Sequence, residues 1–211
     1  QHKDIPYSDG SFDNGIIAHE YGHGVSNRLT GPITNANCLS NLEQMGEGWS
    51  DFFALMLTQL PGDTSTTKRG IGTFATNQAV DGAGIRPTVY STDMTINPAK
   101  YSFLKTYGNS DSPHNTGYVW ASMVWDLNWK MIDKYGFSPD LYNGKAGNNM
   151  ALQLVMTGLK LQPCSPGFVD GRDAIIKADE QLNEGANKCD IWTVFARRGL
   201  GYSALQGSTN S

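Results

Sequence analysis

Two histidines and a glutamate lie together near the start of the chain, with types and spacing suited to metal chemistry. Residues 19–23 read His-Glu-Tyr-Gly-His and follow a short apolar run. In a helix, the four-residue spacing brings the imidazoles of His19 and His23 to one face, one above the other. Such a pair can converge on one Zn²⁺ at about 2.0–2.1 Å per nitrogen. Glu20 can then act as general base on a zinc-bound water, so these residues predict zinc-assisted hydrolysis.

A catalytic zinc site needs a third protein ligand, and the sequence offers a carboxylate. A third histidine is excluded, because the positions seven and ten residues after His19 hold Ser26 and Leu29. Apolar residues predict a buried helix from about residue 48 to about residue 60, ended by Pro and Gly. Glu47 lies on the first turn of this helix and is the predicted third zinc ligand.

Asp51 follows Glu47 by four residues and lies on the same face of the predicted helix. We expect Asp51 to accept the free ring N–H of a ligand histidine, His19, and so to fix its tautomer. Glu43 is a competing third ligand, although it lies before the apolar run. Glu47 is preferred over Glu43 for this reason. The helix dipole would favour a carboxylate at this helix start without any metal, but it explains one carboxylate and not the Glu-x-x-x-Asp pair.

Helices must position these residues, and the apolar periodicity predicts a mainly α single domain over residues 1–211. Residues 61–113 are rich in Gly, Thr, Pro and Asn without a helical period. So long an irregular segment is uncommon unless it is functional. We therefore expect it to form a loop that walls the cleft, with a short strand or helix inside. The predicted helices cover residues 15–26, 48–60, 117–135, 149–161, 167–184 and 189–198.

Several runs of the sequence resemble the fungalysin family of secreted zinc metalloendopeptidases, which are thermolysin-like gluzincins. The likeness extends from about residue 9 to residue 202. The resemblance implies the helical lower lobe of a thermolysin-like zinc-peptidase catalytic domain, Zn²⁺ as cofactor, protein or peptide substrates and an extracellular location. The matching runs are residues 13–31, 45–52, 90–98, 114–121, 170–175 and 185–201.

One large departure concerns the start of the chain. The resemblance implies a β-rich lobe before the zinc helix, but only 18 residues precede His19. We therefore expect the chain to be the C-terminal part of a larger enzyme, with its own N-terminal lobe or propeptide as a partner. The alternative is an inactive, zinc-stabilised half-domain that needs a partner lobe or binds an inhibitor.

The transition state of peptide hydrolysis needs donors for the developing oxyanion. His114 precedes a strong helical pattern and matches the family histidine that donates to this oxyanion. A second donor is usually a tyrosine between the two zinc-binding segments, but residues 24–46 contain none. Tyr101 resembles a family tyrosine upstream of the histidine and is the predicted second donor; Tyr90 and Tyr107 are alternatives.

Composition and charge describe a soluble globular protein. The chain is 39% hydrophobic, carries a net charge of −4 and has no block of like charges, so neither nucleic acid nor a membrane is an expected partner. Of the three cysteines, Cys164 and Cys189 bracket one predicted helix. A disulfide between them is the favoured pairing, which would leave Cys38 as a free thiol.

Overall fold

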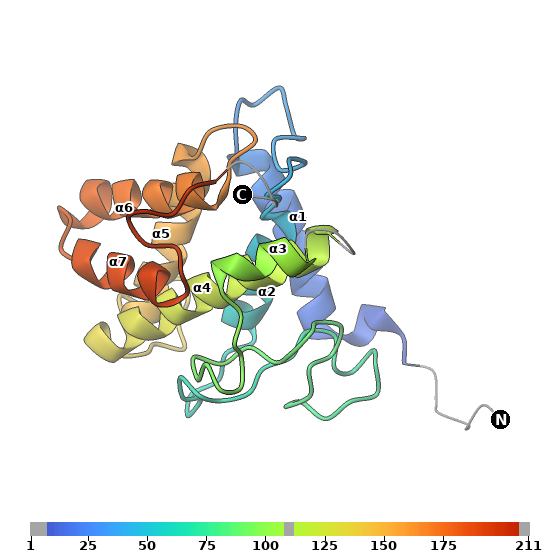
Figure 1. Ribbon diagram of the computed structural model, residues 1–211. Helices are drawn as coiled ribbons and strands as arrows, with labels where there is room; N and C mark the ends of the chain where they lie inside the picture. Colours follow the sequence, from blue (N-terminus) through green and yellow to red (C-terminus); the bar gives the residue numbers. More distant parts are fainter. Residues whose placement is uncertain (1–7, 108–111, 207–211) are drawn as a thin grey trace.

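The computed structural model describes residues 8–107 and 112–206 of the chain, and it is mainly helical (Figure 1). This confirms the predicted fold class. Two short 3₁₀ segments, η1 (Gly10–Phe12) and η2 (Tyr101–Phe103), precede α1 and α3. The α-helices are α1 (Asn14–Leu29), α2 (Gly46–Leu57), α3 (Leu104–Tyr107), α4 (Ser112–Tyr135), α5 (Gly147–Leu161), α6 (Phe168–Asn183) and α7 (Lys188–Arg197).

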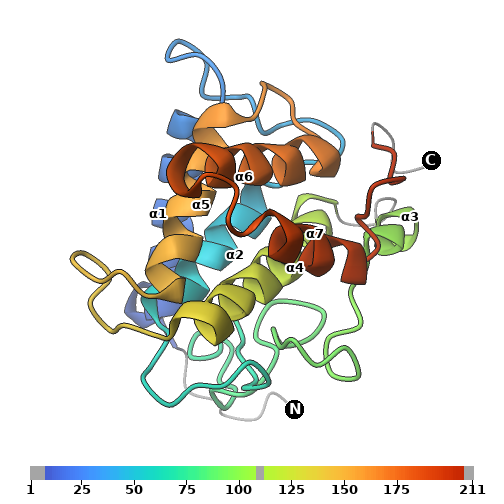
Figure 2. The ribbon, with the colours of Figure 1, turned by 90° about the vertical axis from the view of Figure 1, so that its left-hand side faces the viewer.

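The helix α2 forms the centre of the molecule. It packs between α1 and α4, while α5 and α7 pack on α4 and α6 packs on α5. Figure 2 shows α5, α6 and α7 in front of α1 and α2. Every residue of α2 from Gly48 to Met56 is buried, because other elements cover this helix on all sides. A side chain carried on α2 is therefore attached to a helix that the surrounding elements hold in place.

Three glycines allow the helices that carry the candidate site to approach closely. A Cβ on Gly22 of α1 would lie 2.9 Å from Ser50 Cα of α2. A Cβ on Gly117 of α4 would lie 2.4 Å from Glu47 Cβ, and one on Gly48 would lie 2.4 Å from the Gly117 carbonyl oxygen. Real Cβ atoms do not approach so closely, so these crossings require glycine. The crossings bring α1 and the start of α4 against the start of α2.

Apart from α3, each α-helix given above corresponds to a predicted helix, and apart from the start of α4 the ends differ by at most three residues. The helix predicted from residue 117 begins at Ser112. Pro113 suits this earlier start, because the first turn of a helix does not use the N–H group that proline lacks. His114 consequently belongs to the first turn of α4. Among residues 8–107 and 112–206, no helix is both long and apolar enough to span a bilayer.

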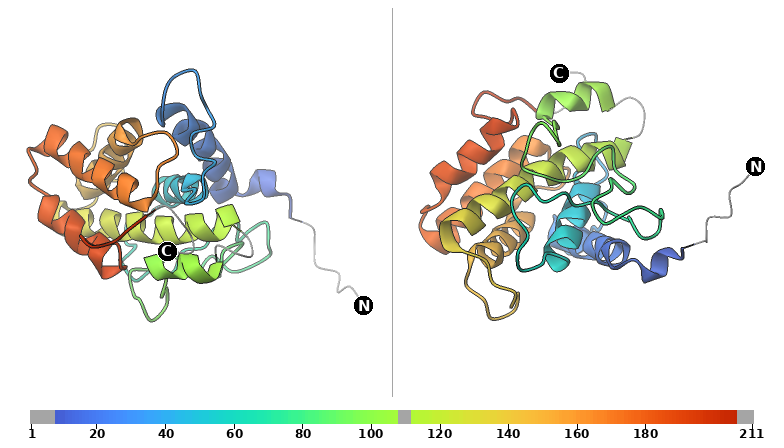
Figure 3. Two further views of the ribbon diagram at one scale, coloured as in Figure 1. Left: turned by 45° about the horizontal axis from the view of Figure 1, so that its top comes forward. Right: turned by 90° about the horizontal axis from the view of Figure 1, so that it is seen from below.

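The irregular segment between α2 and α3 runs along one side of the helical layers (Figures 1 and 3). Within the described residues, β-structure is limited to isolated bridges, Arg69 with Tyr90 and Ile71 with Gly84. Asp13 joins this segment to α1: its carboxylate caps the helix at Gly15 and Ile16 and also accepts the backbone N–H groups of Phe74 and Ala75. The segment is thereby fixed beside the first turn of α1.

The predicted cysteine pairing is wrong. Cys38 is bonded to Cys164, and Cys189 is an exposed free thiol. The physical reason is the 16-residue helix α6, which separates Cys164 from Cys189 by roughly 24 Å of helix and exceeds the reach of a disulfide. The loop after α1 instead folds onto the α5–α6 connection, where the Ser165 N–H donates to the Cys38 carbonyl at 2.8 Å.

Candidate metal centre

The structure brings His19 and His23 of α1 together with Glu47 of α2. The two Nε2 atoms lie 3.1 Å apart. Glu47 Oε2 lies 3.3 Å from His19 Nε2, and Glu47 Oε1 lies 3.5 Å from His23 Nε2. Among the described residues, these three form the one group of His, Cys, Asp or Glu side chains close enough to share a metal ion.

The separations are close to the distance between neighbouring ligand atoms in a tetrahedral zinc site. Ligand bonds of about 2.0–2.1 Å at tetrahedral angles place neighbouring donor atoms roughly 3.3 Å apart. The observed separations of 3.1, 3.3 and 3.5 Å lie near this value, with His19 and His23 facing different oxygens of Glu47. Two imidazole nitrogens and one carboxylate are also a donor set that zinc prefers when one position stays open for chemistry. The residues present therefore fit a zinc ion.

Asp51 lies beside His19. His19 Nδ1–H donates to Asp51 Oδ1 at 2.7 Å, which leaves the Nε2 lone pair of His19 directed toward His23 and Glu47. Asp51 is fully buried. Hydrogen bonds from His19 and Arg86 outweigh the cost of its burial and hold the pKa of its carboxyl below the usual value. The ionised carboxylate thus fixes the tautomer and the orientation of His19.

Arg86 is a component of the site that the sequence analysis missed. Its Nε donates to Asp51 Oδ2 at 2.7 Å, and its terminal nitrogen donates to Asp51 Oδ1 at 2.9 Å and to Glu47 Oε2 at 3.0 Å. Its side chain is only 2% exposed, so the contacts act with little screening by water. Burial alone would raise the pKa of Glu47, but His19 and Arg86 lower it to about 2. Arg86 therefore keeps both carboxylates ionised.

Tyr90, which the sequence offered as an alternative donor to the oxyanion, instead contacts Asp51. Its hydroxyl donates to Asp51 Oδ2, and its side chain is fully buried. Both Arg86 and Tyr90 belong to the irregular segment after α2, where no periodicity indicates which side chains point inward. The one available signal was the position of Arg86 and Tyr90 inside a long segment expected to wall the cleft.

The two histidines differ in their electrostatics. Burial opposes protonation of His19, but its hydrogen bonds to Asp51 and Glu47 prevail and raise its pKa to about 9. Burial and the neighbouring His19 lower the pKa of His23. A proton and a divalent cation compete for the same Nε2 lone pair of His19, since its Nδ1–H is committed to Asp51. The acidic surroundings that favour the proton also favour a metal cation.

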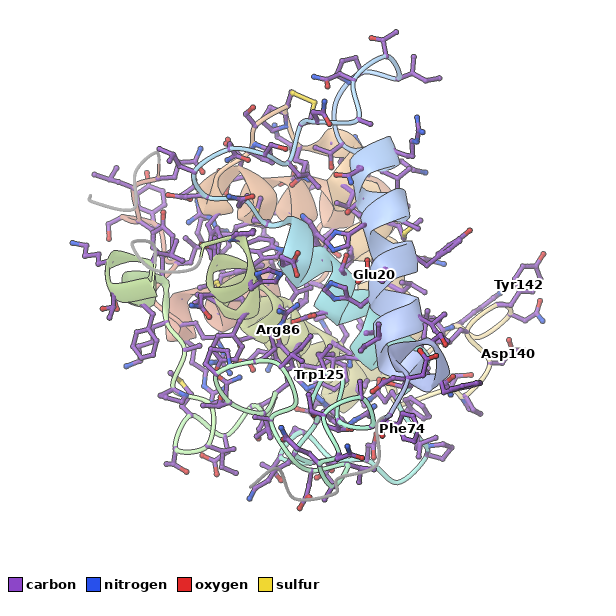
Figure 4. The ribbon with its side chains drawn as sticks, turned by 90° about the vertical axis from the view of Figure 1, so that its right-hand side faces the viewer. Glu20, Phe74, Arg86, Trp125, Asp140 and Tyr142 are labelled. Atoms are coloured by element: carbon purple, nitrogen blue, oxygen red, sulfur yellow. A yellow bond between two sulfur atoms is a disulfide. The ribbon has the colours of Figure 1, made fainter. Side chains whose placement is uncertain are left out.

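Glu20 and His114 lie at the same cavity, which has a volume of about 220 Å³. Glu20 is exposed on α1, and Figure 4 labels it together with Arg86. His114 Nε2 lies 3.6 Å from Glu47 Oε1. Three isoleucines supply the apolar part of the lining. The lining residues are Ile16, His19, Glu20, His23, Glu47, Ile71, Ile85, Arg86 and His114.

Tyr101 is not brought to this cavity. Its hydroxyl donates to Glu43 Oε1 at 2.9 Å and also lies 2.9 Å from the Leu205 carbonyl oxygen, and its ring packs 5.4 Å from that of Phe168. Burial and Glu43 raise the pKa of Tyr101, so its phenol stays a protonated donor within this cluster. The prediction of Tyr101 as a donor to the oxyanion is therefore corrected. The side chain of Tyr107 lies outside the described part of the structure.

Glu43 is also committed elsewhere. Its Oε2 accepts the Phe168 N–H at 2.8 Å, at the start of α6, and its side chain is almost completely buried. A carboxylate at a helix N-terminus is favoured by the unpaired N–H groups and the helix dipole. The structure thus separates the two competing carboxylates: Glu47 joins the histidines and Glu43 begins α6.

Comparison with known proteins agrees with this geometry. The family profile for fungalysin metallopeptidase (M36) matches residues 2–204. Extracellular metalloproteinase mep of Aspergillus fumigatus is 47% identical over 97% of this chain and 33% of its own length. Extracellular metalloproteinase 4 of Trichophyton soudanense is 48% identical over 95% of this chain and 52% of its own length, and the protein of the same name from Trichophyton rubrum is 48% identical over 95% and 32%. The chain thus spans about a third to a half of the length of these relatives. A family match over nearly all of its residues means that the chain belongs to the fungalysin metallopeptidase (M36) family.

Proposed function

We propose that this chain forms the metal-binding part of a secreted zinc endopeptidase that hydrolyses peptide bonds. The observation that carries the proposal is the convergence of His19, His23 and Glu47 at 3.1–3.5 Å beside an open cavity. The relatives named extracellular metalloproteinases support a secreted hydrolase over an inactive half-domain. The disulfide between Cys38 and Cys164 is in keeping with an oxidising, extracellular compartment.

His19, His23 and Glu47 would hold the ion. Zn²⁺, when bound, would supply a Lewis acid that polarises the peptide carbonyl and lowers the pKa of water. Glu20 lines the same cavity and would accept the proton of the attacking water. His114 would donate to the carbonyl oxygen as negative charge develops there. Arg86 and Asp51 would keep His19 and Glu47 in place while this charge moves.

The cavity also supports a class of substrate. Ile16, Ile71 and Ile85 line it beside the candidate ligands. Ile71 is almost fully buried, whereas Ile85 is half exposed. An apolar substrate side chain next to the scissile bond would cover Ile85 and gain about 25 cal/mol for each Å² of apolar surface removed from water. We therefore propose peptides with an apolar residue at this position as preferred substrates.

Substitution of Glu20 by Gln tests the assigned roles, with Glu47→Gln as its control. Because Glu20 is placed as a base and not as a ligand, E20Q should keep Zn²⁺ at the wild-type stoichiometry and lose peptide hydrolysis by about 10²–10⁴-fold. E47Q should lose both metal and activity. The measurements are zinc content after dialysis and turnover of a fluorogenic peptide by the intact protein. Wild-type turnover by E20Q would remove Glu20 from its role.

A further inference from the structure

Tyr90 makes a contact that the proposed mechanism does not use. Its hydroxyl donates to Asp51 Oδ2, on the opposite side of that carboxylate from His19. Neither Tyr90 nor Asp51 is exposed to solvent. We propose that Tyr90 is a positioning residue that sets the metal affinity. It would orient Asp51, and through Asp51 the imidazole of His19; this inference rests on the proposed zinc site.

The hydrogen-bond count at Asp51 explains why the hydroxyl matters. A carboxylate offers about four lone-pair positions, two on each oxygen. Oδ1 accepts His19 Nδ1–H at 2.7 Å and an Arg86 terminal N–H at 2.9 Å, while Oδ2 accepts Arg86 Nε–H at 2.7 Å and the Tyr90 hydroxyl. All four positions are therefore filled by protein donors. Loss of the hydroxyl leaves one position empty at a site with no solvent contact.

Tyr90 and Arg86 act on Asp51 in different ways. Arg86 carries a full charge and reaches both Asp51 and Glu47, so it balances the charge of the site. The Tyr90 hydroxyl is neutral and reaches Asp51 alone. It can therefore restrict rotation of the carboxylate without changing the net charge around the metal. A rotation of Asp51 would redirect the acceptor for His19 Nδ1–H and turn the Nε2 lone pair away from the ion.

The backbone of Tyr90 is fixed to the same helix that carries Asp51. Tyr90 and Arg69 exchange two backbone hydrogen bonds, of 2.7 and 3.0 Å. The Arg69 guanidinium donates to the carbonyl and the hydroxyl of Thr58, which ends α2, and pairs with Asp63 at 2.7 Å. The Tyr90 hydroxyl and the Asp51 carboxylate are thus both held in place by α2, Tyr90 through Arg69 and Asp51 directly. These contacts fix the position of Tyr90, in the irregular segment, relative to Asp51.

A neighbouring tyrosine supplies a matched control. Tyr118 on α4 is almost fully buried, and its ring lies 5.6 Å from that of Tyr90. Its hydroxyl donates to Asn97 Oδ1 at 2.9 Å. Tyr90→Phe and Tyr118→Phe therefore each remove one buried, hydrogen-bonded hydroxyl from the same region, but only Y90F removes a donor from Asp51.

The test compares Zn²⁺ affinity, by competition with a chromophoric chelator, and the visible spectrum of the Co²⁺-loaded intact protein. Loss of a hydrogen bond behind a ligand typically weakens metal binding 10–100-fold. Y90F should bind Zn²⁺ about tenfold more weakly and shift the Co²⁺ bands, because the orientation of His19 changes. Y118F should retain the affinity within about twofold and leave the bands unchanged. Wild-type affinity and spectrum in Y90F, or equal losses in both variants, would overturn the proposal.

Two further variants keep the result decisive. His19→Ala tests the zinc site independently of Tyr90. If H19A binds Zn²⁺ as tightly as the wild type, both the proposed zinc site and the role of Tyr90 are wrong. If H19A loses Zn²⁺ and Y90F does not, only the role of Tyr90 is wrong. Should Y90F fail to fold, Arg69→Gln loosens the Tyr90 backbone from α2 and should also weaken Zn²⁺ binding; unchanged affinity in R69Q would then contradict the proposal.

Discussion

At the scale of single residues, the candidate site is a chain of charges of alternating sign. Glu47 and Asp51 are both ionised, and Arg86 lies between them with a side chain only 2% exposed. Asp51 accepts one hydrogen bond from His19 and so orients its imidazole. Each buried charge therefore has at least one partner of opposite sign, which is the condition for tolerating ions in a protein interior. A metal cation would add positive charge on the side of Glu47 that Arg86 does not cover.

The raised pKa of His19 predicts a stability change that depends on metal. The usual histidine pKa is 6.5, and the hydrogen bonds to Asp51 and Glu47 outweigh burial and raise the pKa of His19 to about 9. Because the folded pKa is the higher one, protonated His19 stabilises the chelator-treated protein fully below pH 6.5. This stabilisation, roughly 3 kcal/mol at most, is lost as pH rises through 9. Thermal unfolding in EDTA should therefore show a falling melting temperature across this window.

Two controls accompany the pH series. The Zn²⁺-loaded protein should lack the decline, since the His19 lone pair is then engaged, and His19→Gln in EDTA should lack it as well. A melting temperature of the EDTA-treated wild type that stays level from pH 6.5 to pH 9 would contradict the charge arrangement described for His19.

Several site residues were predictable because one helix period relates them. The four-residue spacings of His19 with His23 and of Glu47 with Asp51 become spatial neighbours as soon as their segments are helical. Arg86 and Tyr90 were not predictable in this way, because the backbone of the irregular segment follows no repeat. Tyr101 was misassigned for a related reason: sequence distance along such a segment does not indicate direction, and its hydroxyl points to Glu43.

At the scale of elements, the site depends on how closely α2 meets α1 and α4. The contact between Gly48 and Gly117 brings the first turn of α4, with His114, to the first turn of α2, with Glu47. The predicted helix starting at residue 117 placed His114 before α4, whereas the helix begins at Ser112. Side-chain volume at the crossing therefore controls the distance between His114 and the ligand set.

Substitution of Gly117 by Ala tests the importance of this crossing, with Gly24→Ala on α1 as its control. A Cβ at residue 117 would overlap Glu47 Cβ at 2.4 Å, while a Cβ at residue 24 meets no atom within 4 Å. Overpacking typically costs 1–3 kcal/mol, so G117A should lower the free energy of unfolding by about 2 kcal/mol and reduce peptide turnover. G24A should be neutral or stabilising by up to about 1 kcal/mol, because alanine favours helix.

Chemical denaturation and peptide turnover of the two variants provide the measurement. Because both glycines are helical, the gain in helix propensity is common to the two and the difference reports the crossing alone. Equal stability and turnover of G117A and G24A would show that the α2–α4 contact is not required to be this close.

At the scale of the whole molecule, one hydrophobic core joins the helices, and the irregular segment closes one side of it. The apolar periodicity was sufficient to predict the longer helices, since each buries one or more faces in the core, but it did not indicate the four-residue α3. The disulfide was not predictable, because the bond between Cys38 and Cys164 depends on how the loop after α1 folds back onto the α5–α6 connection. The loop at Asp140 and Tyr142 projects away from the candidate site (Figure 4).

We expect His19, His23 and Glu47 to bind one zinc ion. An anomalous difference map at the zinc absorption edge, from crystals of the intact protein grown with Zn²⁺, measures this directly. We predict one peak about 2 Å from His19 Nε2, His23 Nε2 and a Glu47 carboxylate oxygen, with a further position open to the cavity. A map with no peak among these three side chains, or with a fourth protein side chain occupying the open position, would contradict the account.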